Sequence, residues 1–279
     1  MDLKIIDLTE THARFVISGI RPDVANALRR TLMTEVPKMA IETVEFHLGP
    51  IRDEDGKECE SVSPLFDEII AHRLGLVPIP TDPDLYVFKD KCTCNGEGCP
   101  NCTIMYSLNK KGPAEVYSGD LEPLGGKELR VKDELVPIVK LGPKQALLIY
   151  ASAELGTANR HAKWQVTSGA GYRYYPTVTI DLSKCDLCEE CVAACPRDVL
   201  SKKDNKLVVT GLESCILCSA CVTACPKEAI TTHGDNSKFI FEFETDGSLT
   251  ARDTLRKALE ILEKRFDDFR EDVGQLIDG

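Results

Sequence analysis

The 279-residue sequence predicts an α+β fold with more than one domain. Three observations support this prediction: strand-type alternation of apolar residues near both ends, two stretches with apolar residues at helical spacing, and a cysteine-containing repeat in the last third of the chain. The composition is that of a globular protein, with 43% hydrophobic and 28% charged residues. Because aromatic residues make up only 6%, Leu, Ile and Val must supply most of the core.

The N-terminal segment is expected to form a strand pair, a helix and another strand. Residues 1–20 alternate apolar and polar side chains with one break, which predicts the strand pair. Residues 23–35 then place Leu28 and Leu32 four positions apart, on one face of a helix. Pro37 ends that helix, since proline lacks the N–H that a helix interior requires.

The middle of the chain, residues 47–181, is expected to be a β-rich domain. Short alternating runs are separated by Gly and Pro turns, and one short helix is predicted over residues 66–74. Acidic residues cluster at 53–55, and again at 267–272 near the end of the chain. We expect both acidic clusters to face solvent.

The C-terminal segment predicts a strand, a turn and an amphipathic helix over residues 251–270. Phe residues alternate with acidic residues at 239–244, and Thr250 is placed to cap the helix. The apolar residues of this helix then step by four and three along one face: Leu255, Leu259, Leu262, Phe266 and Phe269.

The chain contains thirteen cysteines, and their grouping points to metal ligands rather than disulfides. No export signal and no apolar run of about 18 residues is visible, so we expect a cytoplasmic protein that does not enter a membrane. Twelve cysteines fall into three groups of four. The remaining one, Cys59, is expected to be an inert thiol.

Two of the groups lie in a repeat with an offset of 30 residues, within 182–230. Each group follows C-x2-C-x2-C-x3-C-P, the spacing of proteins that hold two [4Fe–4S] clusters, and its fourth cysteine is expected to ligate the other cluster. Four-cysteine zinc sites are the alternative. Cluster 1 is therefore predicted to be held by Cys185, Cys188, Cys191 and Cys225, and cluster 2 by Cys215, Cys218, Cys221 and Cys195.

The third group follows C-x-C-x4-C-x2-C and consists of Cys92, Cys94, Cys99 and Cys102. Glycines between the ligands allow a tight loop, and four thiolates on one short loop suit a tetrahedral zinc ion. Reduced cysteines without a metal are the alternative, because the spacing is irregular and no histidine assists.

No catalytic residues are predicted. The five histidines are scattered, and neither a nucleotide-binding glycine loop nor a nucleophile motif is present. A net charge of −11 disfavours a direct grip on nucleic acid, which requires clustered Lys and Arg. An iron–sulfur subunit of a multi-protein oxidoreductase is the alternative function, although no flavin or dinucleotide fingerprint accompanies the cysteines.

Three stretches outside the repeat resemble the α-like subunits of cellular RNA polymerases. ANALRRTLMTEVPKMAIETVEF, residues 25–46, resembles their dimerisation helix and the following strand. DEIIAHRLGLVPI, residues 67–79, resembles the matching segment of the archaeal and eukaryotic versions, and residues 241–266 are similar to the closing strand and C-terminal dimer helix. The ferredoxin-like insertion is similar to that of the archaeal form, the D-type assembly subunit.

This resemblance implies three domains: a discontinuous αβ dimerisation domain from residues 1–46 and 232–279, an inserted β-rich domain at 47–181, and an inserted ferredoxin-like domain at 182–231. It also implies a heterodimer with subunit L, on which the large subunits of this nucleotidyltransferase complex assemble. The B-type large subunit and the small subunits N and P are the further partners implied.

The partner-binding residues implied are Arg29 and Arg30, with Arg30 facing the B-type large subunit, together with apolar residues of the two helices. These apolar residues are Leu28, Leu32, Leu255, Leu259, Leu262 and Phe266. The alternative is that either apolar stripe packs within the core of this chain, and that the two arginines simply face solvent. On this view the chain carries out no bond chemistry, and the clusters brace their domain. A role for the clusters in reporting redox state to polymerase assembly is a hypothesis.

Overall fold

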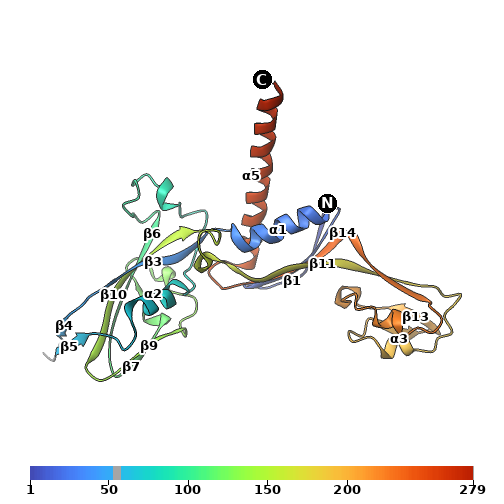
Figure 1. The fold of residues 1–279 in the computed structure, drawn as a ribbon, viewed down its shortest axis with the longest axis horizontal. Coiled ribbons are helices and arrows are strands. Elements are labelled where there is room, and N and C mark those ends of the chain that lie inside the picture. Colours follow the sequence, from blue (N-terminus) through green and yellow to red (C-terminus); the bar gives the residue numbers. More distant parts are fainter. Residues whose placement is uncertain (53–57, 279) are drawn as a thin grey trace. The chain divides into compact units, whose positions relative to one another are not determined.

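The structure, a computed structural model, describes residues 1–52 and 58–278 (Figure 1). The acidic cluster at 53–55 lies outside the described residues, whereas most residues of the cluster at 267–272 are exposed, as predicted. The chain divides into two compact units. The first unit consists of residues 1–7, 13–27 and 171–242, and the second of residues 8–12, 28–170 and 243–279.

The predicted helices are found close to their expected positions. α1 covers Pro22–Thr34, α2 covers Asp67–Gly75, and the C-terminal helix α5 covers Ala251–Asp278. α5 runs further than predicted because Val273 and Leu276 continue its four-and-three apolar spacing. The shorter helical segments are α3 (Glu190–Ala193), α4 (Ala220–Thr223), η1 (Lys89–Lys91), η2 (Ser118–Asp120), η3 (Lys127–Leu129), η4 (Ala162–Trp164) and η5 (Leu212–Ser214).

A four-stranded sheet with the order β1-β2-β14-β11 runs through the first unit. Its aromatic side chains stack in the core: the rings of Phe15 and Phe241 lie 5.3 Å apart, and Tyr172 packs on Phe239 at 5.5 Å. The strand pair predicted in residues 1–20 is confirmed. The strands are β1 (Asp2–Leu8), β2 (His12–Ser18), β11 (Thr167–Ile180) and β14 (Ile230–Thr245).

The cysteine repeat folds into two similar halves within the first unit. Strands β12 (Leu200–Lys203) and β13 (Lys206–Val209) form an antiparallel hairpin between the two cysteine runs. A small core contains Leu200, Leu207 and Ile230 beside the buried Cys191. The cysteine loops therefore pack against this small apolar core.

The second unit is rich in strands. Six strands form a sheet with the order β4-β5-β10-β6-β8, in which β3 pairs with β10, and β7 pairs with β9. Ile70 and Leu74 of α2 belong to the same buried cluster as the apolar residues of these strands. The strands are β3 (Lys38–Phe46), β4 (Pro50–Arg52), β5 (Glu58–Ser61), β6 (Thr103–Lys111), β7 (Ala114–Tyr117), β8 (Glu122–Pro123), β9 (Pro137–Leu141) and β10 (Gln145–Gly156).

The beginning of α5 is fixed within the second unit. Thr250 caps the helix as predicted, since its Oγ1 accepts a hydrogen bond of 3.1 Å from the N–H of Asp253. Asp84 accepts hydrogen bonds from Arg256 at 2.8 Å and Lys257 at 2.9 Å. Arg265, nearly four turns along the helix, pairs with Glu35. In the described part of the chain, no helix combines the length and apolar character that a bilayer crossing requires.

Candidate metal centres and dimerisation helices

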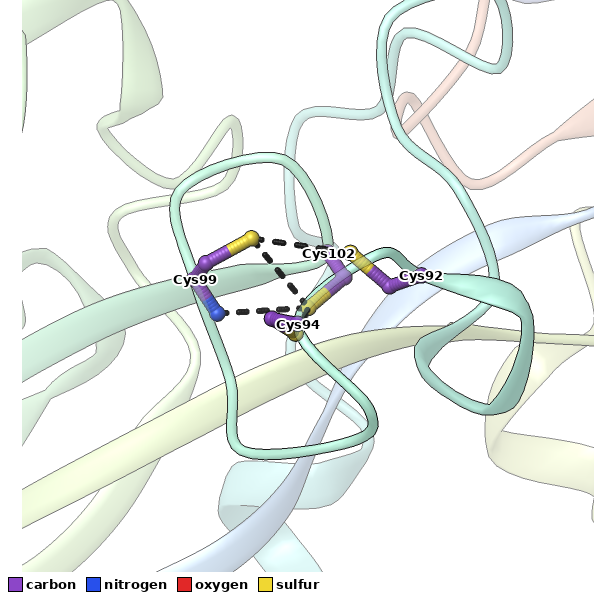
Figure 2. A group of neighbouring side chains, drawn as sticks. All are labelled: Cys92, Cys94, Cys99 and Cys102. Atoms are coloured by element: carbon purple, nitrogen blue, oxygen red, sulfur yellow. Dashed lines mark hydrogen bonds between the residues drawn. The ribbon is translucent and has the colours of Figure 1, made fainter.

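The loop between η1 and β6 brings together all four cysteines of the predicted zinc site (Figure 2). Asn95, Gly96 and Gly98 have positive φ angles of 54°, 84° and 91°, so the chain turns sharply between the second and third cysteines. Cys92 and Cys102 are buried, while the other two thiols are partly accessible. The loop thus folds into a pocket of thiols at the start of a strand.

The distances between these thiols match a tetrahedral zinc site. The Sγ atoms of Cys92 and Cys99 lie 3.5 Å apart, those of Cys94 and Cys102 lie 3.6 Å apart, and those of Cys99 and Cys102 lie 3.9 Å apart. Zn–S bonds of about 2.3 Å in a tetrahedron place sulfur atoms roughly 3.8 Å from one another. Within residues 1–52 and 58–278, this is the group whose metal-binding atoms all lie within 4.8 Å of one another.

The backbone of the loop prepares one thiol for metal binding. A hydrogen bond from the N–H of Gly98 lowers the pKa of Cys94 to about 6. The N–H of Cys99 donates to the Sγ of Cys102 at 3.3 Å. Because zinc binds thiolate rather than thiol, the Gly98 donor favours the ligand form of Cys94 at neutral pH. A backbone hydrogen bond from Cys94 lowers the pKa of Cys92, but burial and the neighbouring thiols outweigh it and raise that pKa to about 11.

The eight cysteines of the repeat line two separate cavities in the first unit. Each cavity contains three cysteines of one run and the fourth cysteine of the other, so the sets are those assigned from the spacing. The first cavity is lined by Cys185, Cys188, Cys191 and Cys225. The second cavity is lined by Cys195, Cys215, Cys218 and Cys221.

The backbone of the two cysteine loops repeats as closely as the sequence does. Leu187 and Glu189 adopt positive φ angles of 61° and 63°, and Leu217 and Ser219 adopt 55° and 61° at the equivalent positions. Non-glycine residues rarely take this conformation, and it persists where the surroundings enforce it. Such turns orient successive N–H groups toward a common point, as in sites that bind anionic groups.

Hydrogen bonds to sulfur are also repeated in the two halves. The N–H of Val199 donates to the Sγ of Cys195 at 3.4 Å, and that of Ala229 donates to the Sγ of Cys225 at 3.3 Å. Both sulfur atoms belong to the fourth cysteine of a run. Hydrogen bonds of this kind stabilise the thiolates that hold iron–sulfur clusters.

The donor set of each cavity fits a [4Fe–4S] cluster better than a single zinc ion. Among the described residues, neither set brings its thiols within 4.8 Å of one another, which a four-thiolate zinc ion would require. Burial raises the pKa of Cys191, with Cys225 adding to the effect, and burial likewise raises the pKa of Cys221, beside Cys195. Four thiols set around a shared apolar cavity are the ligand set of a cubane cluster.

The apolar stripe of α1 faces the inside of the chain. Leu28 is 3% exposed and Leu32 is 1% exposed, so both side chains pack within the chain itself, and their contact with a partner stays a prediction. Helical spacing alone does not distinguish a stripe that packs within the chain from one that packs on a partner. Arg29 is partly buried and donates to the Sδ of Met33 at 3.1 Å, whereas Arg30 is exposed.

The apolar stripe of α5 changes from buried to exposed along the helix. Leu255 is partly buried and Leu262 is 8% exposed, so neither offers a fully accessible side chain, and their contact with a partner stays a prediction. Leu259 and Phe266 are exposed, the latter by 56%, and Leu276 further along is 82% exposed. The C-terminal half of α5 therefore presents large apolar side chains that the described chain does not cover.

A family model described as the RNA polymerase Rpb3/Rpb11 dimerisation domain matches residues 14–266. The chain belongs to this family. The match runs from β2 into α5 and thus spans the cysteine-containing segments. The recognition from sequence as an α-like RNA polymerase subunit is confirmed.

Archaeal relatives of this family member match over nearly their whole length. It is 44% identical to the DNA-directed RNA polymerase subunit Rpo3 of Picrophilus torridus, over 98% of this chain and 100% of the relative. It is 47% identical to that of Thermoplasma volcanium, over 95% and 97%, and 44% identical to that of Methanothermobacter thermautotrophicus, over 94% and 95%. An electron-transfer subunit of an oxidoreductase, the alternative drawn from the cysteine runs, is not favoured by these matches.

One set of contacts to the second cavity is not visible in the sequence. Arg173 on β11 donates to the carbonyl of Cys215, a residue 42 positions away. No local motif marks an arginine for such a contact, because it depends on how the strand and the cysteine loop pack. A search for charged residues flanked by aromatic strand residues, as in the Tyr172–Tyr175 stretch, is the signal that could have drawn attention to it.

Proposed function

We propose that this chain is the non-catalytic assembly subunit of an archaeal DNA-directed RNA polymerase. It pairs with a smaller subunit of the L type, which carries the same dimerisation fold. The observation on which this proposal depends is the exposed apolar face in the C-terminal half of α5, in a chain of the Rpb3/Rpb11 dimerisation family.

The face on α5 is suited to a partner helix. Phe266 and Phe269 are 56% and 66% exposed on consecutive turns, and Leu276 extends the same stripe. Their neighbour Arg265 is already paired within the chain, with Glu35, so the rings are what this part of the helix offers to a partner. Burying one Phe or Leu side chain contributes about 1.5–3 kcal/mol, so three of them can anchor a heterodimer.

The B-type large subunit and the small subunits N and P are the further partners we propose. Arg30 is exposed on α1, and its planar guanidinium can bind a carboxylate of the B-type large subunit through two hydrogen bonds. Assembly would begin with formation of the heterodimer, and Arg30 of the heterodimer would then bind the large subunit. Catalysis of RNA synthesis would lie in the large subunits, and this chain would supply the platform.

Two [4Fe–4S] clusters and one zinc ion are the cofactors we propose, with the ligand sets described above. When bound, each cluster cross-links cysteines from both halves of the repeat, and zinc closes the loop of residues 92–102. The corresponding domain limits are 1–46 and 232–279 for dimerisation, 47–181 for the β-rich domain and 182–231 for the cluster domain. A redox influence on assembly is part of the same proposal, because cluster loss would loosen the segment between the two ends of the dimerisation domain.

The test is anaerobic co-expression of the chain with an archaeal L-type subunit, followed by size-exclusion chromatography with light scattering. We expect a one-to-one heterodimer, and we expect Phe266→Ser with Phe269→Ser to weaken it by about 30-fold or more, which corresponds to roughly 2 kcal/mol. Lys264→Ala, at an exposed position on the same helix, is the matched control and should pair normally.

A monomeric chain in the presence of the L-type subunit would contradict the proposal, as would a double Phe variant that pairs as tightly as the unaltered chain. Iron, sulfide and zinc analysis of the same sample tests the cofactors separately. Cluster-free protein that joins the large subunits normally under both oxidising and reducing conditions would exclude the redox influence on assembly.

A further inference from the structure

Two arginines from the sheet of the first unit bind the backbone segment that leads into the first cysteine of the second cavity. Arg173 on β11 donates from Nη1 to the carbonyl of Cys215 at 2.8 Å and from Nη2 to the carbonyl of Glu213 at 2.5 Å. Arg14 on β2 donates to the same Glu213 carbonyl at 2.9 Å. Two guanidinium groups therefore bind the backbone of residues 213–215, which ends at the predicted cluster ligand Cys215.

The side chain of Glu213 ties the same segment to further strands. Its carboxylate accepts from Lys4 on β1 at 3.2 Å and from the hydroxyl of Tyr175 on β11 at 3.2 Å. Strands β1, β2 and β11 thus all bind η5, the turn that precedes Cys215. Arg14 also pairs with Glu242 on β14 at 3.8 Å, which connects the fourth strand.

The fit between β14 and the loop of the second cavity leaves no space for a side chain. A Cβ atom at Gly234 would lie 2.5 Å from the Cβ of Tyr174 and 3.4 Å from the Cδ1 of Leu217. Leu217 belongs to the loop between the first two cysteines of that cavity. The loop is therefore packed against the sheet as well as hydrogen-bonded to it.

The first cavity lacks this arrangement. Its equivalent residues, 30 positions earlier, are Ser183 and Cys185, and within the described chain no guanidinium donates to their carbonyls. The charged residues that line the first cavity are two acids and two lysines: Asp186, Glu189, Lys202 and Lys227. The charged residue that lines the second cavity is Arg197, and Arg173 lies behind its first cysteine.

We propose that Arg173, supported by Arg14, is a positioning residue that fastens cluster 2 to the sheet and makes it the more easily reduced and more firmly held of the two clusters. This inference rests on the cluster occupancy in the proposed function. Reduction adds one electron to a cluster that already carries negative charge, so cationic groups nearby favour the reduced form. Cluster 1, bordered by acids as well as lysines, receives no such net contribution.

The experiment uses the full chain with its L-type partner, purified anaerobically. Each cluster's midpoint potential is measured by a redox titration monitored by electron paramagnetic resonance, and the rate of iron loss to a chelator is followed by visible absorbance. Cys188→Ser, which alters cluster 1 alone, assigns the two signals. Arg173→Gln is compared with Lys202→Gln, the matched change beside cluster 1, where Lys202 contacts Glu189 at 2.6 Å.

We expect Arg173→Gln to lower the equilibrium constant for reduction of cluster 2 about tenfold, a shift of about 59 mV for one electron, and to leave cluster 1 unchanged. Iron loss from cluster 2 should accelerate by a similar factor. Arg173→Lys keeps the charge but not the two parallel hydrogen bonds, so it should restore most of the potential while iron loss stays fast.

The inference is overturned if Arg173→Gln leaves the potential and iron loss of cluster 2 unchanged, or if it alters both clusters equally. If Arg173→Gln does not fold, Arg173→Lys and Arg14→Gln are judged by the same two measurements. A wild-type chain that contains zinc but no iron removes the proposed cofactors themselves, and the inference with them. A wild-type chain with two clusters and an unresponsive Arg173 rejects the inference alone.

Discussion

The molecule contains two kinds of four-cysteine site, and they differ in how far apart the sulfur atoms lie. In the loop of residues 92–102 the metal-binding atoms all fall within 4.8 Å of one another. In the repeat, the described thiols of each set surround a cavity instead, and each set takes one cysteine from the other run. The ligand chemistry is identical, so we expect the separation set by the backbone to select the size of the metal group that each site would bind.

The comparison shows how the backbone between closely spaced cysteines determines the distances between their sulfur atoms. The sharp turn at Gly96 and Gly98 folds the ligands of the first loop back on one another. In the repeat, residues with positive φ angles, such as Leu187 and Leu217, place three cysteines of one run around the edge of a cavity. The fourth cysteine of each cavity comes from the other run. A loop that closes on itself favours one ion, whereas a rim completed from elsewhere favours a cluster.

The largest effect is expected when a buried ligand of the first cavity is removed. Cys191→Ala should reduce the iron content from about eight atoms per chain to about four or fewer, because one cubane loses a ligand. The small core beside Cys191 should loosen, while the zinc content stays near one per chain. Elemental analysis with hydrogen exchange of residues 182–231 measures both changes.

A matched change is Cys59→Ala, at a cysteine outside the three groups, which should leave iron and zinc unchanged. Loss of zinc together with iron in Cys191→Ala would break the comparison, because it would mean that the two kinds of site depend on each other.

The next largest effect is expected in the tight loop. Cys94→Ser should lower zinc from about one atom per chain to near zero and leave iron unchanged, since a tetrahedral site needs its four thiolates. Structural zinc contributes on the order of 10–16 kcal/mol in small peptides, so residues 89–103 should become accessible to protease. Retention of stoichiometric zinc by this variant contradicts the assignment of the loop.

The pH dependence of the metal-free loop sharpens the same assignment. The pKa of Cys94 is lowered to about 6 by the N–H of Gly98, so its thiolate is present above about pH 6 and is protonated as the pH falls below it. We expect iodoacetamide to alkylate Cys94 at a rate that rises through pH 6 and levels off near neutrality. Mass spectrometry of the digested chain locates the modification, and added zinc should block it. An alkylation rate that still rises steeply above pH 8 would show that the pKa is not lowered.

The smallest effect is expected from the backbone around the zinc loop. Gly98→Ala places a side chain at a φ of 91° and 3.3 Å from the Oγ1 of Thr103, so the N–H that supports Cys94 should shift. Changes to groups that orient metal ligands cost about 10- to 100-fold in affinity, and we expect about tenfold here. Competition with a zinc-binding dye measures the affinity, and Glu97→Ala is the exposed control in the same loop.

Much of the local structure could be predicted from sequence because its causes are local. The strand pair at the N-terminus, the three longer helices and the cap at Thr250 follow from side-chain periodicity and turn residues. The grouping of the eight repeat cysteines around two cavities could also be anticipated, because their spacing is specific. Their occupation by iron remains a prediction.

Features that depend on tertiary packing could not be predicted. Leu28 and Phe266 occupy similar helical stripes, yet one is 3% and the other 56% exposed. Lys38 is buried and pairs with Asp246, more than two hundred residues away, and no local pattern indicates such a partner. The contact of Arg173 with Cys215 is of the same kind.

The length of α5 has a consequence for how the protein must be made. Its 28 residues span about 42 Å. The exposed rings of Phe266 and Phe269, in the C-terminal half of the helix, would associate with those of other newly synthesised chains. We therefore expect self-association to compete with heterodimer formation during translation, and simultaneous production of both partners to protect the helix. Cells that express the two genes in unequal amounts should therefore accumulate the excess chain as insoluble material.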